Sequence, residues 1–136
     1  MCKNVLAVLA GLLLGGMLNI GIIDLGSMFI DPPAGVDPND IESIKANIHL
    51  YGFKDFIVPF LAHALGTLLG AFIAYKFAAT NKMQLALTIG AFFLLGGILM
   101  VKMVGGPLWF IILDLVGAYI PMACLGAKLA GERKEI

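Results

Sequence analysis

The chain has 136 residues, of which 60% are hydrophobic and 13% are charged, and its formal net charge is zero. A soluble domain carries about a quarter charged residues, and a soluble fold of this length could not bury so much apolar surface. The neutral charge also argues against a nucleic-acid partner, because such proteins are basic. The composition therefore predicts an integral membrane protein whose main partner is the lipid bilayer.

Four apolar runs occupy roughly residues 5–30, 56–79, 84–104 and 107–130. Each reaches the ~20 residues that a helix needs to cross a hydrocarbon core. Helices are expected because backbone groups that face lipid must be satisfied within their own segment. We therefore predict an all-α fold, an integral membrane four-helix bundle, with residues 1–136 forming a single transmembrane domain.

The first run follows Lys3 and could be mistaken for a signal peptide. It stays apolar beyond a normal signal sequence and ends in no small-residue cleavage motif, so we interpret it as a retained span. Along it Gly11, Gly15 and Asn19 recur every four residues on one face. Small residues at this spacing favour close helix packing, and Asn19 is expected to hydrogen-bond across helices.

The first loop is predicted to contain a short helix of its own. The sequence "DPND" at residues 37–40 is typical of a helix start, with Asp37 as the N-cap and Pro38 at the first helical position. Apolar residues then follow at helical spacing on one face. This pattern predicts an amphipathic helix over about 38–51 that lies on the outer membrane surface, as a lid or as a gate over a ligand site. The apolar positions are Ile41, Ile44, Ile48 and Tyr51.

Small residues also mark the second span, where Ala62, Gly66, Gly70 and Ala74 recur every four residues. This stripe could pack inside one bundle or between subunits of an oligomer. In the fourth span, Pro121 removes a backbone hydrogen bond and predicts a bend.

The basic residues predict the orientation. Both termini are placed in the cytoplasm by the positive-inside rule, because six of the nine basic residues then share that side. We expect the plasma membrane or a bacterial inner membrane. The six cytoplasmic residues are Lys3, Lys76, Lys82, Lys128, Arg133 and Lys134, and the other three are Lys45, Lys54 and Lys102.

Each of the four spans carries an ionisable residue in the half of the membrane nearer the outside. His63 lies about 12 Å from the outer end of its span, Asp24 about 9 Å and Asp114 about 10 Å, and Lys102 closes the third span. His63 and Asp114 share helical faces with small residues, whereas Asp24 projects away from the glycine stripe of its span. An intramembrane carboxylate seeks a partner, so Asp114 is expected to pair with His63 or Lys102.

Several interpretations remain open for these residues. The pairing could simply hold the helices in register, or the residues could line an outward-facing polar pocket for a cation, a proton or a polar headgroup. A metal site from Asp24, His63 and Asp114 has suitable ligand types but no supporting motif. No cofactor is predicted, because a b-type haem would need a second histidine at membrane depth.

We therefore expect a small transporter or channel-like protein, in which His63 and Asp114 could couple protonation to access. The alternative is a non-catalytic accessory subunit that packs in a homo-oligomer or larger membrane complex. A membrane-embedded lipid enzyme is a third hypothesis, but it lacks an identifiable nucleophile, so no enzyme activity is predicted. The candidate ligand- or proton-binding residues are His63, Asp114, Asp24, Lys102, Asn19 and Thr67.

Overall fold

The structure, a computed structural model, describes residues 1–131. Three of the predicted spans are single helices, α1 (Cys2–Ser27), α3 (Phe53–Phe77) and α4 (Lys82–Val104). The fourth consists of α5 (Leu108–Gly117) and α6 (Ile120–Gly131). All four are long and apolar enough to cross a membrane, and the described residues contain no strand. The predicted all-α four-helix bundle of a multi-pass membrane protein is confirmed.

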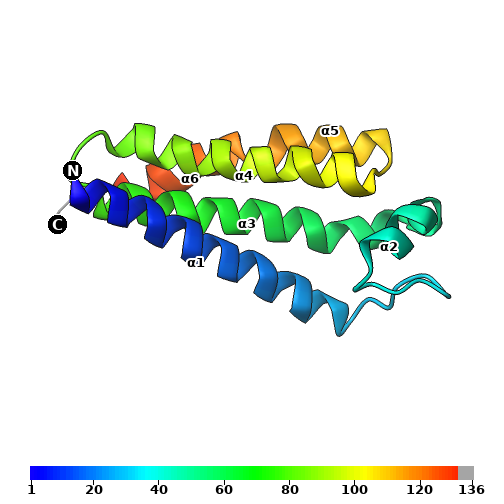
Figure 1. The fold of residues 1–136 in the computed structure, drawn as a ribbon. Coiled ribbons are helices and arrows are strands. Elements are labelled where there is room, and N and C mark those ends of the chain that lie inside the picture. Colours follow the sequence, from blue (N-terminus) through cyan, green and yellow to red (C-terminus); the bar gives the residue numbers. More distant parts are fainter. Residues whose placement is uncertain (132–136) are drawn as a thin grey trace.

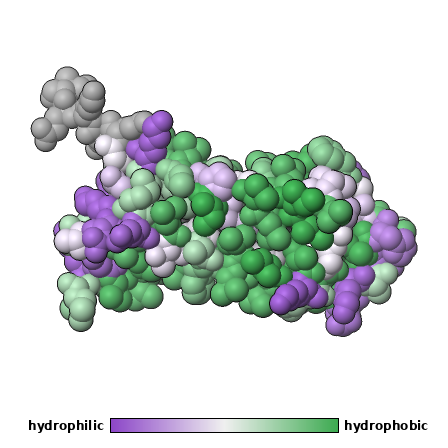
Figure 2. Space-filling model, turned by 90° about the horizontal axis from the view of Figure 1, so that it is seen from above, coloured by the Kyte–Doolittle hydropathy of each residue, from purple (hydrophilic) through white to green (hydrophobic). Residues whose placement is uncertain are grey.

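The helices form an elongated bundle with α3 at its centre (Figure 1), where it contacts α1, α4, α5 and α6. The N-terminus and the end of α6 lie at one end, and the segment 28–52 lies at the other, which we call the loop end. Figure 2 shows a hydrophobic middle with hydrophilic residues gathered toward both ends, as expected of a bundle that spans a bilayer. Arg133 and Lys134, which the orientation prediction counts, lie outside the described residues.

The predicted loop helix is present but shorter than expected. It comprises α2 (Ile41–Asn47) and one 3₁₀ turn, η1 (Ile48–Leu50), in place of 38–51. The N-cap is Asp40, which accepts from the Glu42 N–H at 3.1 Å, so the prediction of Asp37 as N-cap was wrong. Asp37 instead accepts from the Asn39 N–H at 2.9 Å and closes a turn over Pro38. Asp-Pro starts a turn as readily as a helix, and here the turn comes first.

The two glycine stripes pack against each other, and this contact joins α1 to α3. A Cβ built on Gly15 would stand 2.5 Å from the Gly66 carbonyl oxygen, and one on Gly11 would stand 2.5 Å from that of Gly70. The reverse contacts are nearly as tight, because a Cβ on Gly66 or Gly70 would stand 2.8 Å from the carbonyl oxygen of Gly15 or Gly11. Backbones can approach this closely only where side chains are absent, so the stripes are used within the chain.

The rest of the core is built from alanine and glycine in the same way. A Cβ on Gly126 of α6 would collide with the Leu68 carbonyl of α3, and one on Gly90 of α4 would stand 2.7 Å from Ala123. Such small residues bring α3, α4 and α6 together, which fixes the depth of every polar group that these helices carry. The fully buried alanines are Ala62, Ala71, Ala74, Ala86, Ala118, Ala123 and Ala127.

The fourth span breaks at Ala118 and Tyr119, two residues before Pro121. A helix that continued here would need an N–H at residue 121 to bond the Gly117 carbonyl, and proline has none. Helical bonds stop with Ala118 N–H donating to the Asp114 carbonyl and resume with Ala123 N–H donating to the Tyr119 carbonyl. The predicted distortion at Pro121 is therefore a break that reorients Tyr119.

Candidate functional site

A buried cluster of three polar side chains lies between α3 and the broken fourth span. The Nδ1 atom of His63 lies 2.9 and 3.0 Å from the two carboxylate oxygens of Asp114. The Tyr119 hydroxyl donates to Oδ2 of Asp114 at 3.0 Å, and its ring stacks on the imidazole with 5.7 Å between centroids. We call these residues the His–Asp–Tyr cluster.

Each member depends on local backbone structure. His63 and Asp114 project from regular helix, whereas Tyr119 lies in the break, five residues after Asp114. An offset of five residues turns a side chain about 140° away on a continuous helix, so the break is what lets Tyr119 return to Asp114. On the other side, a Cβ on Gly97 of α4 would collide with the Tyr119 hydroxyl. Gly97 therefore makes room for the phenol.

The cluster is closed to its surroundings except at the imidazole. The Asp114 side chain is 4% exposed and Tyr119 is 2% exposed, whereas the His63 side chain is 19% exposed. With Nδ1 held by the carboxylate, Nε2 is the ring atom left to exchange a proton. A carboxylate that fixes one imidazole nitrogen in this way orients the other as a proton acceptor.

Thr67 lies one helical turn deeper than His63 on α3. It is 1% exposed, and its hydroxyl makes no hydrogen bond to any described residue. Its neighbours three residues before and four residues after, Ala64 and Ala71, pack against the α4 and α6 side. Thr67 therefore lies in the interior beside the cluster without joining its hydrogen bonds.

Replacing Thr67 by valine should raise the free energy of unfolding by about 1 kcal/mol, because the isosteric change removes a buried hydroxyl that has no partner. Thr67→Ser, which keeps the hydroxyl, should give no such gain. Unfolding of the purified protein in mixed detergent micelles, followed by circular dichroism, measures both. A less stable valine variant would mean that the hydroxyl bonds the helix backbone instead.

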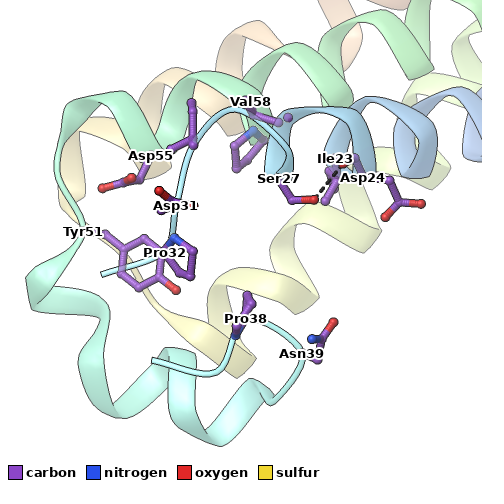
Figure 3. Close-up of a pocket in the computed structure, with 13 residues that line it drawn as sticks. Ile23, Asp24, Ser27, Asp31, Pro32, Pro38, Asn39, Tyr51, Asp55 and Val58 are labelled. Carbon is purple, nitrogen blue, oxygen red and sulfur yellow. Dashed lines mark hydrogen bonds between the residues drawn. The ribbon is translucent and has the colours of Figure 1, made fainter. Parts of the chain in front are cut away.

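A second polar feature is a pocket of about 380 Å³ at the loop end, between the end of α1, the following loop and the start of α3 (Figure 3). We call it the acidic pocket, because Asp24, Asp31 and Asp55 all line it. Burial and the neighbouring Asp55 charge raise the pKa of the Tyr51 phenol on its rim, so this residue stays neutral. The three carboxylates would attract cations to the pocket.

The acidic pocket and the His–Asp–Tyr cluster are neighbours along α3. Pro59 lines the pocket and precedes His63 by four residues, so the two share one helix face about one turn apart. Proline at 59 has no N–H for the Asp55 carbonyl, which is left without its usual helical donor at the pocket wall. The acidic pocket therefore ends about one helical turn from His63 along α3.

The structure brings some of the predicted site residues together and leaves others apart. His63 and Asp114 pair as expected, and Thr67 lies next to them. Asp24 is exposed at the acidic pocket. Lys102 is exposed in the last turn of α4, and the partner of Asp114 is His63 rather than Lys102. Asn19 lies against Gly66, 3.0 Å from where its Cβ would be, and the described structure gives its amide no hydrogen bond.

Sequence reasoning missed Tyr119 and gave Asp31 and Asp55 no site role. The available signal for Tyr119 was its chemistry, since a phenol within an apolar span usually finds a hydrogen-bond partner. Its position, two residues before a proline, also marked a place where helical spacing fails.

Comparison with known proteins found no matching family, no matching curated protein and no matching solved structure. Within residues 1–131, no three His, Cys, Asp or Glu side chains are grouped so that they could hold a metal ion. Any functional assignment must therefore come from the geometry of the site.

Proposed function

We propose that this protein is a small membrane transporter or channel-like protein that moves protons, or a small cation in exchange for protons, through the His–Asp–Tyr cluster. The observation that carries the proposal is the buried pairing of His63 with Asp114. Ionisable groups inside membrane spans are costly and typically mark ion pathways or proton relays.

The charges suit this role. With Asp114 ionised and His63 neutral, the cluster carries one net negative charge, and a proton on Nε2 neutralises it. A net charge inside a membrane span needs a counter-charge, and a proton or another cation at the cluster would supply it. The acidic pocket at the loop end, one helical turn away at Pro59, would gather cations for it.

The test is proton flux into liposomes that hold the purified protein and a pH-sensitive dye, driven by a potassium diffusion potential. Asp114→Asn should reduce the flux to the level of protein-free liposomes, because the amide oxygen can still accept a hydrogen bond but the side chain carries no charge. Glu42→Gln, which removes an exposed carboxylate outside both features, should leave it unchanged. Wild-type flux from a folded Asp114→Asn variant would refute the proposal.

The proposed orientation places both termini in the cytoplasm and the acidic pocket outside, since six of the nine basic residues then lie inside. Two exposed positions test it in a Cys124→Ser background. A membrane-impermeant maleimide should label intact cells that carry Cys2→Ser with Asn39→Cys, and it should leave the native Cys2 unlabelled until the cells are opened. The opposite labelling pattern would reverse the orientation.

The accessory role is the alternative, and the glycine stripes were its main support. Those stripes are occupied within the chain, between α1 and α3, so they offer no face to another subunit. Native mass spectrometry in mild detergent is the direct test. A stable complex with other proteins would favour the accessory role, whereas a lone protein that conducts protons would favour transport.

A further inference from the structure

A second, apolar groove lies between α3 and α5 near the loop end, with a volume of about 120 Å³. Its walls are aromatic and aliphatic throughout. It opens on the outer face of the bundle, where Phe53, Trp109 and Leu113 are 70%, 44% and 48% exposed. The lining residues are Phe53, Phe56, Ile57, Phe60, Leu61, Trp109, Phe110 and Leu113.

The aromatic rings make the mouth of this groove a fixed structure. Phe53 of α3 stacks on Trp109 of α5 with 5.5 Å between centroids, and Phe56 meets the same indole edge-on at 5.6 Å. Phe56 also contacts Phe110 at 4.6 Å. From Phe53 to Leu61 the groove runs about 12 Å along the helix axis, which is the depth of the upper part of a lipid acyl chain.

One cationic side chain, Lys54, follows the lining residue Phe53 at the mouth of the groove. Lys54 is exposed in the first turn of α3 and shares a helix stripe with Ile57 and Leu61, at offsets of three and seven. The N-terminal end of α5 adds partial positive charge there, whereas Asp55 caps the N-terminal end of α3. The neighbouring acid, Asp55, lines the acidic pocket instead (Figure 3), and its carboxylate accepts from the Gly52 N–H at 2.7 Å.

We propose that this groove binds one acyl chain of an anionic phospholipid, with Lys54 contacting the phosphate at the loop end. The apolar walls select a hydrocarbon chain, and the cationic mouth selects a negative headgroup over a zwitterionic one. The groove lies between α3 and α5, as the His63–Asp114 pair does, but nearer the loop end, and this inference does not depend on the transport proposal.

The chain's single tryptophan, Trp109, lines the groove and reports on its occupant directly. The protein would be reconstituted in bilayers of unlabelled phosphatidylcholine with a small fraction of brominated phosphatidylglycerol or brominated phosphatidylcholine. Bromine on an acyl chain quenches indole fluorescence on contact. One lysine at a membrane surface favours an anionic lipid by about fivefold, so brominated phosphatidylglycerol should quench at about one fifth of the concentration.

Two variants separate headgroup selection from groove binding. Lys54→Gln should remove the preference and make both brominated lipids quench equally, while Lys45→Gln on α2, a matched change outside the groove, should keep it. Leu113→Phe should weaken quenching by both lipids, because the larger side chain fills the groove.

Three results would overturn the proposal. Equal quenching of the wild type by both lipids would mean that the groove contacts bulk lipid without selection. A preference that survives Lys54→Gln would place the headgroup site elsewhere. Absence of quenching in folded protein would mean that a second copy or another protein covers Trp109.

Discussion

Gly15→Ala should lower the free energy of unfolding by about 2 kcal/mol, whereas Gly16→Ala, the next residue along α1, should raise it by up to about 1 kcal/mol. A Cβ at Gly15 would stand 2.5 Å from the Gly66 carbonyl oxygen and 3.1 Å from the Gly70 Cα. Both contacts are backbone, so α1 must move as a unit to relieve them. At Gly16 the same methyl group meets nothing within 4 Å.

The two variants are matched because they add the same atom to the same helix and gain the same helix propensity. Their difference therefore isolates the packing of α1 on α3. Equilibrium unfolding in mixed detergent micelles, followed by circular dichroism, measures it. Equal effects at the two positions would mean that α1 does not approach α3 through its glycines. The positions of Asn19 and Asp24 relative to α3 would then be wrong as well.

The fold was predictable from sequence because its signals are local. Apolar length determined the four spans, and the period of the small residues identified the faces that pack. The pairing of the stripes was not predictable, since Gly11 and Gly15 could have met another chain as readily as Gly66 and Gly70. Choosing between these partners requires the complete arrangement of the helices.

The candidate site was predictable only where helices stay regular. His63 and Asp114 were placed at one depth by counting residues from span ends, and the structure pairs them. Tyr119 was not predicted as a site residue because the break before Pro121 changes the helical register between Tyr119 and Asp114. Asp24 was expected at the same depth, but lies at the separate acidic pocket, since depth along a helix does not determine which neighbour a side chain faces.

Asp114→Ala should lower the free energy of unfolding by about 3 kcal/mol. The carboxylate accepts from the Tyr119 hydroxyl and bonds the His63 ring, and its removal leaves both buried or half-buried groups without a partner. Each unsatisfied polar group costs about 1–3 kcal/mol in such surroundings. Asp114→Asn, which can still accept a hydrogen bond, should lose less than half as much.

A double-mutant cycle with Tyr119→Phe tests whether the loss arises from the orphaned hydroxyl. In the wild type this change should cost about 1 kcal/mol, because it removes the bond to Asp114. In the Asp114→Ala background it should be neutral or stabilising, because the hydroxyl then has no partner to lose. The informative quantity is the difference between the two effects of Tyr119→Phe, and it is independent of the cavity that alanine leaves.

The same variants separate a structural cluster from a functional one. If the cluster only holds α3 against the fourth span, proton flux should follow the free energy of unfolding. Asp114→Asn, which destabilises less than Asp114→Ala, should then keep most of the flux. If the cluster carries protons, Asp114→Asn should abolish the flux while the fold survives, and Tyr119→Phe should retain flux because the phenol only orients the carboxylate. Flux that tracks the free energy of unfolding across all three variants would contradict the transport proposal.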